Sequence, residues 1–214
     1  MKSAHSLFII LILFSTAVAY TQSPILSLYA NQGSHGVENA YYKDLDNVQA
    51  PYVGTWLLDN GTTVLKVMLR KRTMVFINTY SGNHYEDILV GEYLYSKNGA
   101  VRVNTLENLS QEYENNPDYN LHSAGLMRKS AYPKCNECAE GEKRLTLYIN
   151  DPARRHLSGL SNEFIIRRFF DSGVEKLKVW FPLTGNGIVT DENFELSNFR
   201  SFNLPYGEYV LTKQ

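Results

Sequence analysis

The chain has 214 residues, with 21 basic and 22 acidic side chains, so its formal net charge is −1. Apolar residues make up 43% of it and charged residues 20%, values typical of a soluble folded protein. The balanced charge argues against nucleic-acid binding driven by bulk electrostatics, and the 27 Phe, Tyr and Trp residues argue against intrinsic disorder.

Residues 1–19 have the three-part layout of a cleavable secretory signal peptide. Lys2 precedes an apolar run from Leu7 to Phe14, and Ala17-Val18-Ala19 has the small-x-small pattern that signal peptidase accepts. As a helix this run rises only about 12 Å, well short of a ~30 Å hydrocarbon core. We expect cleavage after Ala19 and export to the periplasm, the outer cell surface or the medium. We expect no transmembrane anchor after cleavage.

The mature chain divides into an extended lead-in and one β domain. Residues 20–51 follow neither the helical nor the strand period and are rich in Asn, Gly and Asp, so they are expected to pack on the domain without a core of their own. Residues 52–214 are expected to form a single domain. The chain contains 19 Asn but only eight Ala after position 20, which favours turns and strands over helices.

Short strands separated by turn residues follow from position 52 onward. The turn signals are Asp59-Asn60-Gly61, the charged run Arg70-Lys71-Arg72, Ser81-Gly82-Asn83 and Ser96-Lys97-Asn98-Gly99. Residues 107–142 are ambiguous, and within them 121–129 fits either a short helix or a strand. The predicted strands are 52–58, 62–69, 73–80, 85–95, 100–106, 143–150, 162–170, 174–181 and 207–212.

Cys135 and Cys138 are the two cysteines of the chain and allow three interpretations. A local disulfide is the default in an oxidising compartment. A thioredoxin-like redox pair needs a strand before it and a helix after it, whereas this pair lies in a turn-rich stretch. A zinc site needs about four ligands, of which the pair supplies two, so His122 or His156 would have to complete it.

The strand order predicts an all-β fold, an antiparallel meander that closes into an up-and-down barrel of about 8–10 strands. A two-sheet β-sandwich is the alternative. Several strands have large apolar side chains on both faces, for example 164–169, so the lead-in, the middle loops or a partner is expected to cover part of the outer surface.

Two resemblances follow from these segments. Gly54-Thr55-Trp56 opens the first strand of the domain and resembles the G-x-W opening of lipocalin and wider calycin barrels, in which the Trp plugs the closed end and a basic side chain often stacks over it. The segments 40–44, 51–56, 85–93 and 103–106 together look like an uncharacterised family of exported bacterial proteins of the kind found in flavobacteria. That resemblance implies export and one compact β domain, and it implies no catalytic residues.

Several side chains are candidates for binding or structural roles. Tyr85, Tyr93 and Tyr95 share a strand parity and would line a ligand cavity if that face points inward, or form an ordinary β surface if it points outward. Arg168, adjacent to Arg167 on one strand, would bind a carboxylate or stack on Trp56 or Trp180 if it points inward. The structural candidates are Trp56, as the plug of the core, and Gly54, which allows close backbone approach.

The acidic residues have weaker patterns. Glu86 and Asp87 are neighbours on a strand and point to opposite faces, while Glu86 and Glu92 stand about 20 Å apart, so they do not form a catalytic carboxylate pair. Asp44, Asp46 and Asn47 lack the Gly and the terminal Glu of a calcium loop. We therefore expect no metal and no cofactor, and we name no catalytic residue.

The sequence predicts an exported, non-catalytic binding module with a small hydrophobic ligand or an envelope protein as its partner. The alternative is a structural or interaction protein of the cell envelope with no small-molecule ligand. An enzyme has the least support, because the chain lacks a Walker A loop, an H-E-x-x-H motif, a G-x-S-x-G motif and a dinucleotide-binding glycine pattern.

Overall fold

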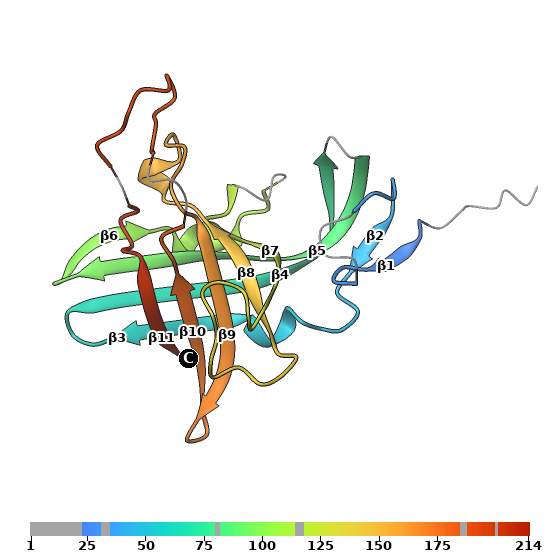
Figure 1. Ribbon diagram of the computed structural model, residues 1–214, viewed down its shortest axis with the longest axis horizontal. Helices are drawn as coiled ribbons and strands as arrows, with labels where there is room; N and C mark the ends of the chain where they lie inside the picture. The colour runs from blue at the N-terminus through green and yellow to red at the C-terminus, as the bar shows by residue number, and fades with distance from the viewer. Residues whose placement is uncertain (1–22, 31–34, 80–81, 114–117, 185–187, 200) are drawn as a thin grey trace, which may run out of the picture.

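A computed structural model of the chain describes residues 23–30, 35–79, 82–113, 118–184, 188–199 and 201–214. The expected signal peptide and its cleavage point at Ala19 lie outside these residues. Within them, no helix is long and apolar enough to cross a membrane. The strands (Figure 1) are β1 (Ile25–Ser27), β2 (Tyr41–Lys43), β3 (Gly54–Asp59), β4 (Thr63–Thr79), β5 (Gly82–Lys97), β6 (Ala100–Asn104), β7 (Leu121–Arg128), β8 (Lys143–Ile149), β9 (Glu163–Asp171), β10 (Val174–Phe181) and β11 (Gly207–Lys213).

Eight of these strands close into a ring. The hydrogen-bonded order is β5-β4-β3-β11-β10-β9-β8-β7, and β7 returns to β5 through the pairs Val90–His122 and Gly91–Leu121. Every pairing within the ring is antiparallel. β6 pairs with β5 outside the ring, and β1 and β2 extend the sheet from β5 in parallel. The all-β prediction is confirmed, and the pairings among strands of residues 52–214 are antiparallel, but the sheet as a whole is mixed because β1 and β2 of the lead-in pair in parallel. The strands belong to one sheet rather than the two of a sandwich.

The long hairpin of β4 and β5 differs most from the predicted strands. The sequence suggested a charged bend at 70–72, but β4 continues through these residues and has an irregularity between Arg72 and Val75, where Met74 has a φ of 54°. The bend was predicted from exposed charge, yet the cations have partners that keep them on a strand. Arg70 and Arg72 lie 2.7 and 2.8 Å from Glu112.

Two other segments gain strands. Residues 121–129, which the sequence left open between helix and strand, contain β7. The lead-in, expected to be extended, contains β1 and β2. The sequence did not predict these strands, because parallel pairing requires no local turn signal. In Figure 1 both lie beside the part of the β4–β5 hairpin that projects from the body of the molecule. Short 3-10 helices occupy Ala50–Tyr52, Leu106–Ser110 and Pro152–Arg154.

The inside of the ring is an apolar core. Its fully buried members include Trp56, Leu89, Tyr93, Phe164 and Phe181. Gly91 is needed where β5 passes β4, because a Cβ there would come within 2.5 Å of a Leu69 methyl and 2.7 Å of the Met68 carbonyl oxygen.

The outer faces of the ring strands are covered by loops, as their two-sided apolar pattern predicted. Tyr119 and partly buried Leu109 and Tyr113 pack on Ile88 and Val90 of β5. The cysteine loop packs on Ile165 and Trp180 of β9 and β10. Within the described residues, the middle loops therefore supply much of the expected cover.

Candidate functional site

Tyr93 and Tyr95, expected to line a ligand cavity, are buried members of the ring core. The Tyr93 hydroxyl donates a hydrogen bond to the Asn150 carbonyl oxygen at 3.1 Å, and burial raises the pKa of Tyr93 well above its usual range. Neither tyrosine is among the residues that line the clefts at Tyr29, Tyr148 and Trp180. Both side chains therefore contribute apolar packing and one buried hydrogen bond.

Tyr85 lies apart from the other two tyrosines. It is half-buried on the part of β5 that pairs with β2, opposite Tyr41, and its ring centroid is 5.4 Å from that of Phe76. The three tyrosines do alternate in step along β5, but Tyr85 lies near the start of this long strand, outside the ring core. The three tyrosines do not form one site.

Arg168 binds a carboxylate, and that carboxylate belongs to the protein. Its Nε donates to Glu175 at 2.5 Å, and Lys213 Nζ reaches the same oxygen at 2.9 Å. Desolvation raises the pKa of Glu175, but the two hydrogen bonds outweigh it and leave the pKa below its usual value. Lys213 Nζ, rather than Arg168, lies over the Trp56 ring, 5.1 Å from its centroid.

Trp56 and Gly54 occupy the beginning of β3. The Trp56 indole is fully buried, and its Nε1 donates to the Tyr52 carbonyl oxygen at 2.8 Å. Gly54 has a φ of 129°, a conformation that L side chains rarely adopt. The Lys213 side chain packs beside Gly54, with its Cε 3.5 Å from where a Cβ of Gly54 would lie.

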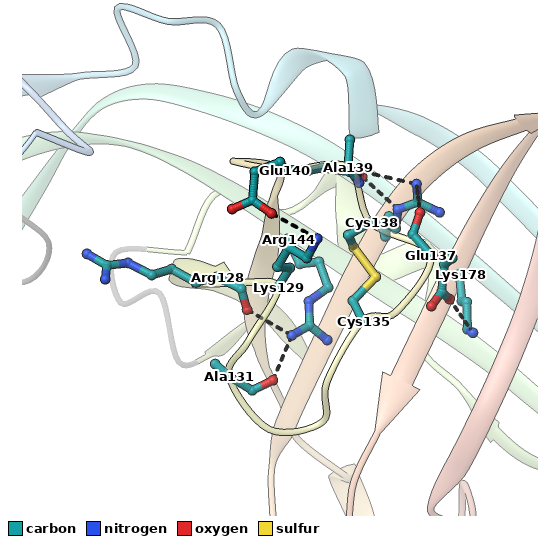
Figure 2. Close-up of a disulfide and its surroundings, with 12 residues drawn as sticks. Arg128, Lys129, Ala131, Cys135, Glu137, Cys138, Ala139, Glu140, Arg144 and Lys178 are labelled. Carbon is teal, nitrogen blue, oxygen red and sulfur yellow. Dashed lines mark hydrogen bonds and ion pairs between the residues drawn. A yellow bond between two sulfur atoms is a disulfide. The ribbon is translucent and has the colours of Figure 1, made fainter.

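The two cysteines are joined by a disulfide in a loop between β7 and β8. Figure 2 shows Arg144 beside this bond, with its Nη2 donating to the Arg128 and Ala131 carbonyl oxygens at 3.1 and 3.0 Å. The guanidinium also lies 5.1 Å from the centroid of the Trp180 ring, and burial lowers the pKa of Arg144. These contacts order the loop that covers β9 and β10.

A buried polar network holds the lead-in against β4 and β5. We call this network the lead-in junction; its residues are Tyr41, Asp44, Gln49, Lys71 and Asp87. Lys71 Nζ lies 2.8 Å from Asp44 and 3.5 Å from Asp87. The Tyr41 hydroxyl donates to Asp87 at 2.5 Å, and burial together with this carboxylate raises the pKa of Tyr41 to about 12. Asp44 is therefore committed to protein contacts rather than to a calcium loop.

Glu92 is also committed to the protein. It is fully buried on β5 and accepts hydrogen bonds from the Asn120 backbone and side-chain amides at 3.2 and 2.6 Å. Burial raises the pKa of Glu92 in spite of these bonds. Glu92 is bonded to Asn120 and lies apart from Glu86, as the strand spacing predicted.

A cleft of about 300 Å³ lies next to the lead-in junction. Apolar walls come from Leu28, Tyr29 and Leu126, and polar groups from the lead-in, β5 and β7 face the same space. The lining residues are Leu28, Tyr29, His35, Glu86, Asp87, Ser123, Ala124, Gly125 and Leu126. The register of β7 shifts against β8 between Ser123 and Gly125, and this places a stretch of small residues at the cleft.

Two imidazoles and a carboxylate form a cluster beside this cleft; His35 and Glu86 line the cleft, and His84 lies behind them. His35 Nδ1 is 3.3 Å and His84 Nε2 is 3.6 Å from Glu86 Oε2, and the three atoms lie within 4.8 Å of one another. His84 is 3% exposed, and neither of its ring nitrogens has a hydrogen-bond partner among the described residues. The Glu86 hydrogen bond raises the pKa of His35 despite partial burial.

The family of this chain follows from a comparison of its whole length. Residues 1–214 match the family model described as "Family of unknown function (DUF6705)". The chain belongs to this family. No curated protein and no solved structure matches it. Membership in a family of unknown function agrees with the expectation of an uncharacterised family and assigns no activity.

The cluster was missed from the sequence for a definite reason. His84 and Glu86 form an H-x-E pair at i and i+2, which places both on one face of a strand, and this pattern was readable. His35 comes from the lead-in, far away in sequence, and reaches the pair only through the parallel addition of β2 to β5. Local spacing of histidines therefore does not reveal this group.

Proposed function

We propose that this chain is an exported, non-catalytic binding module that holds a small ligand in the cleft between the lead-in and strands β5 and β7. The observation that carries the proposal is a contrast between the interior of the ring and the cleft on its outer side. The inside of the ring is filled by buried apolar side chains, Tyr93 and Tyr95 among them. The outer cleft combines apolar walls with carboxylates at a volume that suits a small molecule.

A lipocalin- or calycin-like barrel is the finer fold that we propose for the ring. Support comes from the closed circuit of eight strands, from the Gly54-x-Trp56 opening, and from Lys213 of the last strand stacked on the Trp56 ring. Calycin-like barrels pair a basic side chain with this Trp. Fold alone does not determine the ligand, so the position of the ligand is argued from the cleft instead.

Export is proposed from the leader and from the disulfide. Residues 1–19 have the charged, apolar and small-residue regions of a signal peptide. The Cys135–Cys138 bond is of a type that persists in oxidising compartments. Pulse-labelling of the full chain in its native cell, followed by N-terminal sequencing, tests this point. A mature chain that keeps residues 1–19 inside the cell would contradict it.

The lining of the cleft favours a small amphipathic ligand with a cationic or hydrogen-bond-donating group. Glu86 offers a carboxylate beside the apolar surface of Leu126 and Tyr29, whereas the Asp87 carboxylate is bonded within the lead-in junction. Ligand-observed NMR with a panel of small aliphatic and aromatic amines is the direct test. We expect saturation transfer to a subset of the panel with the unmodified chain.

A variant that fills the cleft decides the location. A Cβ at Gly125 meets no atom within 4 Å, and the backbone there is not left-handed, so Gly125→Leu should fold and occupy the cleft. Ala100→Leu adds a side chain of the same size at the exposed start of β6 and serves as the control. The proposal predicts loss of binding in the first variant alone. Amines that bind both variants equally, or a panel with no binder, would contradict it.

The envelope interaction protein remains a second candidate because of one surface feature. Residues 188–199 expose several large apolar side chains, of which Phe194 at 86% and Leu196 at 72% are the most exposed. Figure 1 shows this part of the chain, between β10 and β11, extending away from the ring. A protein partner held at this loop would cross-link to a photoreactive residue at position 194 in the native envelope. Absence of any specific cross-link would remove this candidate.

A further inference from the structure

The cluster of His35, His84 and Glu86 brings together three atoms of metal-ligating type from two distant parts of the chain. His84 and Glu86 lie on one face of β5, and the lead-in is tied to the same stretch by the Asn39 amide on the Asn83 carbonyl at 2.7 Å and the Tyr85 amide on the Ala40 carbonyl at 2.8 Å. His35 is thereby brought within 3.3 Å of Glu86. The arrangement is part of the fold rather than an encounter of long surface side chains.

His84 is the residue that an ion pair alone does not explain. A protonated His35 beside Glu86 forms an ordinary salt bridge, and that bridge satisfies both residues. His84 is almost completely buried, yet both of its ring nitrogens lack a hydrogen-bond partner among the described residues. Burying a polar group without a partner is costly. An imidazole with a free nitrogen 3.6 Å from a shared carboxylate has the placement of a metal ligand.

We infer that His35, His84 and Glu86 bind a divalent transition-metal cation, with Zn²⁺ as the best fit, and that its remaining coordination position opens into the cleft. The inference goes beyond the proposed binding function, because the metal is tested without any organic ligand.

The donor set and its spacing favour Zn²⁺ over the hard cations. Two imidazole nitrogens and one carboxylate oxygen form a His₂Glu set, whereas Ca²⁺ and Mg²⁺ prefer oxygen ligands. Bonds of about 2.0–2.1 Å in a tetrahedron place donor atoms about 3.3 Å apart. The two distances to Glu86 are 3.3 and 3.6 Å, and all three atoms lie within 4.8 Å, so small side-chain rotations suffice. Three protein ligands leave a position for water or for a ligand.

The surroundings also orient the imidazoles. The Tyr42 ring stacks on His35 at a centroid distance of 4.2 Å and meets His84 edge-on at 5.3 Å. Tyr42 is itself held, because its hydroxyl accepts a hydrogen bond from the Val37 amide at 3.1 Å. These ring contacts restrict the rotation of both imidazoles.

Equilibrium dialysis and isothermal titration with Zn²⁺ test the inference, using the chain prepared without a polyhistidine tag. We expect one Zn²⁺ per chain, with no comparable binding of Mg²⁺ or Ca²⁺. Co²⁺ in place of Zn²⁺ should give the visible absorption of a four-coordinate site. His84→Gln should weaken Zn²⁺ binding at least about 100-fold, since removing a direct ligand should cost no less than removing an outer contact.

Matched variants make the result decisive. His156→Gln removes another histidine, one that is exposed and outside the cluster, and should leave binding unchanged. If the His84→Gln variant does not fold, His35→Gln and Glu86→Gln replace half-buried residues and should weaken Zn²⁺ binding in the same way. Stoichiometric binding that survives all three ligand substitutions, or an unmodified chain that binds no Zn²⁺, would overturn the site. Zn²⁺ binding without amine binding would contradict only the proposed function.

Discussion

The ring core and the lead-in junction are stabilised by opposite kinds of chemistry. The core inside the ring consists of apolar and aromatic side chains, and the buried Tyr93 hydroxyl donates to a backbone carbonyl oxygen. The lead-in junction has two buried carboxylates that contact Lys71, one of which also accepts from the Tyr41 hydroxyl. The Gln49 side-chain amide donates to the Asp87 backbone carbonyl oxygen. The cleft and the histidine cluster lie beside the junction. The difference shows that the apolar core lies inside the ring and that the polar flank carries the candidate site.

The largest expected effect comes from the core. Trp56→Ala removes a fully buried indole together with its hydrogen bond to Tyr52, and should lower the free energy of unfolding by about 3–5 kcal/mol. Chemical denaturation measures this change. Phe194→Ala, at a side chain that is 86% exposed, is the control and should change stability by less than about 0.5 kcal/mol. Similar losses in both variants would mean that Trp56 is not part of a packed core.

Breaking the lead-in junction should cost somewhat less. Asp44→Ala removes the acceptor of the Val48 and Gln49 amides and the closest partner of Lys71. The expected loss is about 2–4 kcal/mol, because buried groups are left without partners. Hydrogen exchange should accelerate in residues 35–49 while β8–β10 stay protected. Asp46→Ala, two residues away and exposed, is the control. Uniform acceleration over the whole sheet would show that the two regions are not separable.

The pH dependence of stability probes the closure of the ring at β7. Burial, with Arg155 adding to it and Glu86 opposing it, lowers the pKa of His122 from 6.5 to about 4. The unfolded chain therefore binds a proton that the folded chain excludes as pH falls from about 6.5 to about 4, and stability is lost over that window by as much as ~3 kcal/mol.

Urea denaturation at several pH values measures this loss. His122→Gln should flatten the profile between pH 4 and 6.5, and His156→Gln should leave it as it is. An unchanged profile in His122→Gln would show that other groups cause the dependence.

The smallest effect is expected at the disulfide. Cys135 and Cys138 are three residues apart, so their bond closes a short loop and restricts the unfolded chain little. Replacing both with Ser should lower stability by about 2 kcal/mol or less. Trp180, which packs against the loop, should report the local change in fluorescence while the circular dichroism of the sheet is kept. Complete unfolding of the variant would mean that the loop supports the ring itself.

The strands were predictable wherever a local pattern specified them. The turns around Asn60-Gly61 and Asn98-Gly99 lie between paired strands, and Gly61, Asn98 and Gly99 have the positive φ that tight hairpins need. The two-sided apolar pattern of residues 164–166 correctly indicated an outer cover, since Phe164 and Ile166 face the ring core and Ile165 faces the cysteine loop. The strand break at 70–72 was wrong because charge marks a bend only where it has no partner.

The candidate site was predictable only in pieces. The expected carboxylate partner of Arg168 proved to be Glu175 of the same chain, and the cation on Trp56 proved to be Lys213. Glu175 lies on the neighbouring strand of the same hairpin. Lys213 comes from a strand far from Trp56 in sequence, so local spacing does not identify that contact. The small-ligand prediction and the export prediction stay open to the measurements described above.

The amino-acid sequence by itself determined that this chain is built of strands, because its turn residues and period-2 apolar patterns are local properties. Only the tertiary structure decided which strands are neighbours: β7 meets β5, β11 meets β3, and the parallel β2 carries His35 to His84 and Glu86. The physical reason is that strand pairing and side-chain clustering depend on contacts between distant segments, and such contacts leave no periodic mark on either segment alone.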